Sequence, residues 1–178
     1  MNIFYLDCDI TKSVKAHIDA HIVKMPLEAA QLACTTLWID EIFGYTPRLL
    51  TKIERDKLTK AKKEFRLFPY LPTHVNHPCA VWARTSLENY SYLINYGLEL
   101  GLEYTSRYGK VHKSVEQVLK LLPNPSCLKS MSFTEPPKCM PDCYIENSTV
   151  ESYRNYYRTE KAQLKGGWKD CKNVPHWL

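Results

Sequence analysis

Polar and titratable side chains recur at helical spacing between residues 17 and 35 of this 178-residue chain. Successive members of this polar stripe are three or four residues apart, which places them on one helix face: His17, His21, Lys24, Glu28, Gln31 and Thr35. Two imidazoles, an amine and a carboxylic acid are groups that transfer protons or attack electrophilic carbon. A solvated face is usually richer in Glu, Lys and Arg, so we interpret the stripe as the face of a functional pocket. A solvated or structural face is the alternative.

An apolar stripe of the same period runs beside the polar one and predicts a helix over residues 11–38. Its members face the core: Val14, Ile18, Ile22, Met25, Ala29 and Leu32. Pro26 lies inside this pattern, where it cannot donate to the carbonyl of Ile22. We therefore expect either a kink or a second helix that starts at Pro26.

A second long helix is predicted over residues 78–108. Asn76 or His77 can cap its start, and Gly109 can end it in a left-handed conformation. Gly97 and Gly101 lie one turn apart inside it. Each costs about 1 kcal/mol relative to alanine, so we expect that they let a neighbouring helix approach closely.

A third helix is predicted over residues 149–165, after a proline-rich loop at 123–148 that wraps the surface. Basic residues recur along it at helical spacing beside tyrosines: Arg154, Arg158, Lys161 and Lys165. This combination suits contacts with phosphates and bases, although tyrosines at helical spacing also pack in cores. Residues 51–66 hold seven Lys or Arg against three acids, which fits either a solvated helix or a phosphate-contacting arm.

The chain length and the three helical patterns predict a single all-α domain, residues 1–178, with about three main helices and long connecting loops. Hydrophobic content of 44% and charged content of 24% are typical of soluble proteins, and a net charge of +5 permits a polyanionic partner. We expect a cytoplasmic protein without a membrane partner, because no basic region precedes the apolar start MNIFYLDCDI and no apolar run is long enough to span a bilayer.

Seven cysteines, an odd number, are expected to be reduced. Cys139 and Cys143 lack the paired CxxC spacing of zinc sites, so neither a metal nor another cofactor is expected there. A site made by His17 and His21 with Glu28 or His77 is an alternative, although Lys24 on the same face would repel a cation.

Three stretches together resemble the small all-helical bacteriophage-type pyrimidine-dimer DNA glycosylases, also called endonuclease V. The first is Asp19, His21 and Glu28, like the family's D-x-H followed seven residues later by its catalytic Glu. The second is the long middle helix that follows His77. The third is RTEKAQLKGGW at 158–168, similar to the family's closing helix and its Trp, here Trp168. The chain also resembles uncharacterised phage-encoded proteins that share its HxxxHxxKM, RYGKxHK and YRNYY stretches.

The resemblance implies a nucleophilic N-terminal α-amine, with Glu28 managing protons around a Schiff-base intermediate. An α-amine ordinarily titrates near 8 and a lysine near 10.4, so the α-amine is the better nucleophile at neutral pH. The sequence departs from the family at Asn2, which is bulkier than removal of Met1 normally tolerates, and at Leu27 and Gln31, which replace arginines.

These observations predict a phage DNA glycosylase or lyase that acts on a damaged or modified base in the host cytoplasm. Glu28 would be the acid and base, Met1 or Lys24 the nucleophile, and His21 an orienting or protonating group. His17, Gln31 and His77 would line the pocket, while the basic residues of 149–165 and Trp168 would bind DNA. The alternative is a non-catalytic module that binds nucleic acid, a nucleotide or a host protein through the same helix face.

Overall fold

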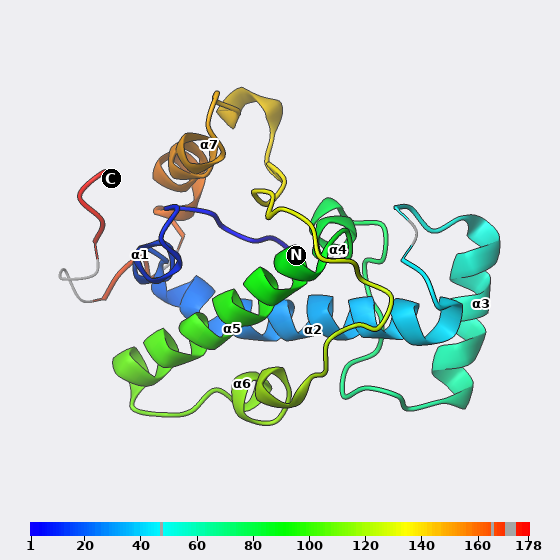
Figure 1. Cartoon of the computed structure of the whole chain (residues 1–178). Coiled ribbons are helices and arrows are strands. Elements are labelled where there is room, and N and C mark those ends of the chain that lie inside the picture. Colours follow the sequence, from blue (N-terminus) through cyan, green and yellow to red (C-terminus); the bar gives the residue numbers. More distant parts are fainter. Residues whose placement is uncertain (47, 165, 170–173) are drawn as a thin grey trace.

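The computed structural model describes residues 1–46, 48–164, 166–169 and 174–178, and over these ranges the chain is helical without any strand (Figure 1). The α-helices are α1 (Ile10–Lys15), α2 (Asp19–Phe43), α3 (Lys52–Glu64), α4 (Pro78–Ala83), α5 (Leu87–Tyr108), α6 (Lys113–Glu116) and α7 (Thr149–Tyr156). Short 3₁₀ turns, η1 (Leu119–Leu121) and η2 (Asp142–Tyr144), interrupt the loops, and a π-helical segment η3 (Tyr157–Lys161) continues α7. The predicted all-α fold is confirmed. None of the helices in these ranges is both long and apolar enough to cross a membrane.

The centre of the molecule is α2, which α5 crosses (Figure 1). Gly97 and Gly101 of α5 are buried at this packing surface, as predicted. A Cβ added to Gly97 would lie 2.6 Å from a methyl of Leu119 and 3.1 Å from the Cβ of Ala29, and one added to Gly101 would lie 2.6 Å from a methyl of Val115. The two glycines therefore bring α5 against α2 and against the α6 and η1 turns.

The first predicted helix is divided, although no second helix starts at Pro26. It breaks at residues 16–18 into α1 and α2, and α1 is capped by Asp9, whose carboxylate accepts the Lys12 N–H at 3.0 Å. At Pro26, in contrast, α2 continues without a break. An interior proline costs about 3 kcal/mol, and the burial of α2 offsets this cost, since Ile22, Met25 and Ala29 are almost fully buried around it.

The predicted helix over 78–108 is also divided. Ser86 stops α4 from continuing into α5 by capping the second helix, because its hydroxyl accepts the Asn89 N–H at 3.1 Å. The predicted ends are confirmed: His77 caps α4 through its ring nitrogen, and Gly109 ends α5 with φ 65°.

The last helix is shorter and less regular than predicted. It starts as expected at Ser148, whose hydroxyl caps it, but α-helical geometry ends at Tyr156. The π-helical turn of η3 then rotates the following side chains away from a simple helical stripe. The predicted position Lys165 lies outside the described residues.

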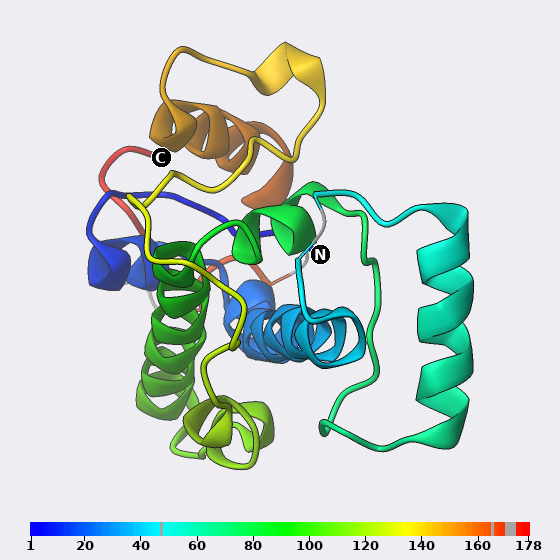
Figure 2. The same ribbon diagram turned by 45° about the vertical axis from the view of Figure 1, so that its right-hand side comes forward.

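The proline-rich loop at 123–148 crosses α4 and α5 before it reaches α7 (Figure 2). Asp40 of α2 anchors its start, because the carboxylate accepts the backbone N–H groups of Ser126 at 2.7 Å and Cys127 at 3.0 Å. Burial alone would raise the pKa of Asp40, but hydrogen bonds from Cys127 and Ser126 outweigh it and hold the pKa below its usual value. The loop is thus held as part of the packed structure.

Candidate functional site

The first residues of the chain are buried like a core element. Ile3, Phe4, Tyr5 and Leu6 are each at most 5% exposed and extend between α5, α7 and the start of α2. This N-terminal segment, residues 1–7, therefore does not project into solvent. Because the segment is packed in this way, the α-amine of Met1 lies beside the middle of α2.

The α-amine of Met1 lies beside Glu28. The amine nitrogen is 3.9 Å from Glu28 Oε2, and the backbone N–H of Asn2 donates to the same oxygen at 3.3 Å. The other carboxylate oxygen is 2.9 Å from Lys24 Nζ, an i,i+4 ion pair. We call Met1, Lys24 and Glu28 the amine site. Glu28 is 9% exposed in its side chain and contacts Lys24, which confirms the predicted burial and pairing of this acid.

Asn2 fixes the amine through its side chain. The amide Nδ2 donates to the carbonyl of Cys139 at 2.8 Å, and Oδ1 accepts from the hydroxyl of Tyr153 at 2.7 Å. One residue thereby joins the N-terminal segment to the proline-rich loop and to α7. These bonds orient whichever nitrogen is the free amine: that of Met1, or that of Asn2 if Met1 is removed.

His77 lies in the same region, close enough to the N-terminus and Glu28 for their charges to act on it. Burial lowers its pKa, and the positive charge of the nearby N-terminus lowers it further. Its Nδ1 accepts the N–H of Cys79 at 3.2 Å, and the Cys79 thiol lies 3.6 Å from the Cys139 thiol.

The two other histidines of the polar stripe are built into the core. His17 uses both ring nitrogens: Nδ1 donates to the Ser13 carbonyl at 2.8 Å, which leaves Nε2 to accept from the Tyr96 hydroxyl at 2.8 Å. Burial lowers the pKa of His17 to about 4. His17 therefore has no lone pair free for a metal.

His21 packs more closely on the N-terminal segment than His17, whose ring meets Phe4 edge-on at a centroid distance of 5.9 Å. Its ring stacks on Phe4 at a centroid distance of 4.3 Å, and Nδ1 bonds the Tyr157 hydroxyl. Burial, followed by the charges of neighbouring basic groups, lowers its pKa to about 3. His21 is thus neutral at physiological pH, which suits an orienting role and argues against a proton donor.

The basic residues of the last helix are not equivalent. Arg154 is a structural residue: Nε donates to the Leu6 carbonyl at 2.8 Å, and Nη2 pairs with Asp7 at 3.1 Å. Arg158 is exposed and donates to the carbonyl of Trp177 at 3.0 Å. The ammonium of Lys161 lies 4.4 Å from the ring centre of Tyr156. Trp168 is half-buried against the core.

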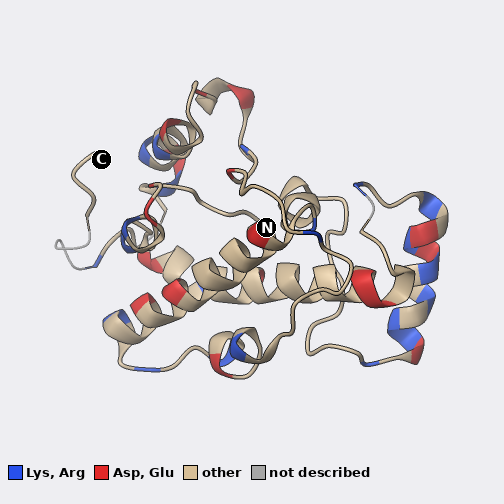
Figure 3. Cartoon of the chain, in the orientation of Figure 1, with Lys and Arg blue, Asp and Glu red and all other residues tan. Residues whose placement is uncertain are grey.

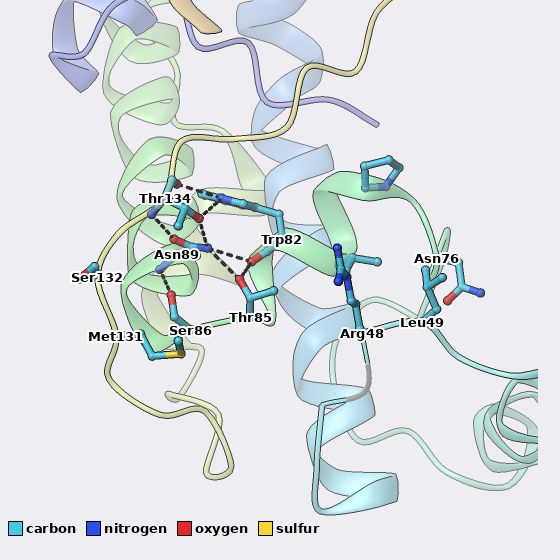
Figure 4. A pocket seen from close by; sticks show the side chains of 12 residues that line it. Arg48, Leu49, Asn76, Trp82, Thr85, Ser86, Asn89, Met131, Ser132 and Thr134 are labelled. Atoms are coloured by element: carbon cyan, nitrogen blue, oxygen red, sulfur yellow. Dashed lines mark hydrogen bonds between the residues drawn. The ribbon is translucent and has the colours of Figure 1, made fainter. Parts of the chain in front are cut away.

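A pocket of about 550 Å³ opens on the other side of α4 (Figure 4). Trp82, Asn89 and Thr134 are hydrogen-bonded to one another on one side of it, and Arg48 stands on the opposite side. No residue of the polar stripe lines this pocket. Gln31, the member of the stripe that was predicted to line a pocket with His17 and His77, is half-buried on α2.

Sequence reasoning missed Asn2 as an anchor, and it missed the pairing of Cys79 with Cys139. The H-x-C spacing of His77 and Cys79 at a helix start was a usable signal that these two side chains lie close together. Cys139 is 60 residues beyond Cys79 in the sequence, and the path of the proline-rich loop places the two thiols together. No local sequence pattern specifies that path.

In chemical terms the amine site offers a primary amine, a carboxylate that can take its proton, and a second cation that neutralises the carboxylate. A search for known proteins similar to this chain finds no match among protein-family models, curated proteins or solved structures.

Proposed function

We propose that this protein is a DNA glycosylase with lyase activity that forms a Schiff base through its N-terminal α-amine. The observation that carries the proposal is the 3.9 Å approach of the amine nitrogen to Glu28 Oε2 in a buried setting. A buried carboxylate next to a free α-amine is the arrangement that such chemistry requires. The resemblance of Asp19, His21 and Glu28 to the phage-type glycosylases supports the same conclusion.

In the proposed reaction the unprotonated amine attacks C1′ of the deoxyribose. The bond between C1′ and the base breaks, and the base leaves with the bonding electron pair and takes up a proton. The attacking nitrogen loses its own proton to Glu28. The C1′–O4′ bond of the sugar ring then breaks with its electron pair going to O4′, which takes up a proton, and the nitrogen forms an iminium with C1′. Loss of a proton from C2′ then allows β-elimination of the 3′ phosphate, and hydrolysis releases the enzyme.

The α-amine is a better candidate nucleophile than Lys24. The side chain of Lys24 is 65% exposed and is tied to Glu28 by an i,i+4 ion pair, whereas the side chain of Met1 is 4% exposed. The amine is also held by its own backbone and by the anchoring of Asn2, so little freedom is lost on attack.

Two surfaces support binding of the DNA backbone. Arg158 and Lys161 of η3 remain candidates for phosphate contacts. The second surface is α3, an arm at one end of the molecule on which positive residues predominate (Figure 3). Lys60 and Lys63 are exposed there and are available for phosphates.

Borohydride trapping on DNA with a single abasic site tests the proposal. Wild-type protein should give a covalent complex, because borohydride reduces the iminium to a stable amine. Lys24→Ala should still be trapped, while protein acetylated at its N-terminus should not. Absence of any trapped complex from folded, DNA-bound wild-type protein would refute the proposal.

A second candidate function is supported by the pocket beside Trp82. Its mostly apolar lining, an aromatic ring and Arg48 suit a nucleotide base and its phosphate, so the protein would act as a non-catalytic binding module. Calorimetric titration with nucleotides, comparing wild type with Arg48→Ala, distinguishes this candidate. Nucleotide binding that depends on Arg48, together with no trapping on abasic DNA, would favour it.

A further inference from the structure

Three metal-ligating side chains meet next to the amine site. His77 caps α4, Cys79 lies in its first turn, and Cys139 comes from the proline-rich loop. Each offers one ligand atom, and these atoms all lie within 4.8 Å of one another. Cys79 is fully buried, and the other two residues are half-buried. The cluster therefore joins segments that are far apart in the chain at a partly closed position.

The spacing of the cluster matches a tetrahedral zinc ion. Zinc binds thiolate at about 2.3 Å and imidazole at about 2.0–2.1 Å, so two sulfurs on one ion lie about 3.8 Å apart and a sulfur and a nitrogen about 3.6 Å apart. The two thiols here are 3.6 Å apart. No two of the ligand atoms are more than 4.8 Å apart, so only a small side-chain movement would bring them to these distances.

The ring of His77 has one nitrogen without a proton. Its Nδ1 accepts the backbone N–H of Cys79 at 3.2 Å, so this nitrogen carries no proton and faces the first turn of α4. An ion held here would replace this weak capping bond with a coordinate bond.

We propose that His77, Cys79 and Cys139 form a binding site for a zinc-class divalent cation, with three protein ligands and the fourth position left to water. Two sulfurs and one imidazole favour zinc over magnesium or calcium, which take oxygen ligands. On binding, each thiol releases its proton as a metal–sulfur bond forms, so the two thiolates balance the charge of the ion. The site consequently adds no net charge beside the N-terminal amine.

The site would have a mechanical consequence for the start of the chain. The side-chain amide of Asn2 donates to the backbone carbonyl of Cys139 at 2.8 Å. The Oδ1 atom of Asn2 lies 3.9 Å from the Cys79 thiol. An ion that ties the loop to α4 would therefore also hold the residue that anchors the N-terminal segment. The inference goes beyond the proposed function, because metal binding does not depend on Schiff-base chemistry.

Cobalt(II) titration of the reduced, untagged, metal-free full-length protein tests the site. Tetrahedral thiolate coordination should produce a sulfur-to-cobalt charge-transfer band that saturates at one equivalent and disappears on addition of zinc. Cys79→Ser and Cys139→Ser should each weaken cobalt binding at least about 10-fold. Cys143→Ser, which changes an exposed cysteine near the same loop, is the matched control and should leave the band unchanged.

Circular dichroism melting shows whether each variant is folded, and the wild-type titration decides the question even if Cys79→Ser does not fold. The absence of a charge-transfer band in reduced wild-type protein would overturn the proposal, as would a band of full strength in folded Cys139→Ser. Because the readout uses no DNA, its failure is distinct from a failure of borohydride trapping.

Discussion

The two halves of the polar stripe have the same spacing but opposite surroundings, and only the second half lies wholly on α2. His17 and His21 face tyrosine hydroxyls from α5 and η3, which occupy their ring nitrogens. Lys24 and Glu28, one and two turns further on, face the start of the chain and its α-amine. Helical periodicity thus specifies which residues share a face, whereas the segments packed on that face determine which of them can do chemistry.

The largest effect is expected from Glu28→Gln, which keeps the shape of the side chain and removes its charge. The rate of trapping on abasic DNA should fall about 10²–10⁴-fold, because proton transfer typically contributes this much. DNA affinity should change by no more than a few-fold, as measured by fluorescence anisotropy. A variant that is folded and traps at the wild-type rate would place the chemistry elsewhere.

The histidine half of the stripe should affect stability instead of turnover. His17→Ala removes the side-chain donor to the Ser13 carbonyl and the acceptor of the Tyr96 hydroxyl proton in a buried position, so unfolding in urea should become easier by about 3 kcal/mol. His176→Ala, at an exposed histidine, is the control. The trapping rate per folded molecule should stay the same, and a specific loss of trapping would give His17 a catalytic role.

Acidification should lower the stability of the fold through the two buried histidines of the stripe. The pKa values of His17 and His21 in the folded protein, about 4 and about 3, lie below the ordinary value of 6.5. The unfolded chain therefore binds protons first, so stability is complete above pH 6.5 and falls as pH decreases toward the folded pKa values, by up to about 1.4 kcal/mol per pH unit for each histidine. Urea midpoints between pH 7 and 5 measure this slope. His17→Ala should flatten it, and an unchanged slope in that variant would contradict the burial argument.

The smallest effect is expected from Lys24→Ala. The lysine is 65% exposed, so loss of its i,i+4 pair with Glu28 should cost no more than about 0.5 kcal/mol of unfolding free energy. Trapping should change by less than about 10-fold, since the α-amine would remain beside Glu28. Urea denaturation and trapping on the same preparation measure both. Complete loss of trapping would identify Lys24 as the nucleophile.

The sequence predicted the features that depend on single residues or on neighbours within one helix. The capping of α4 by His77 and the left-handed end at Gly109 follow from single residues, and the close approach at Gly97 and Gly101 follows from their missing side chains. Glu28 was predicted to be buried next to Lys24 because both lie on one helix face.

The remaining features depend on packing between distant segments. The continuity of α2 through Pro26 depends on tertiary burial that outweighs a local penalty, and the break at Ser86 depends on a cap inside an otherwise helical pattern. The meeting of Asn2 with Cys139 joins positions 137 residues apart. Periodicity carries no information about such pairs.

The identity of the residue that carries the trapped DNA tests the central claim most directly. Wild-type protein should be trapped on abasic DNA, digested and mapped by mass spectrometry, with the intact mass of the free protein establishing which residue bears the α-amine. The account predicts that the adduct lies on the N-terminal peptide, on the nitrogen of Met1 or, if Met1 is removed, of Asn2. An adduct on the peptide that contains Lys24, with the N-terminal peptide unmodified, would contradict it.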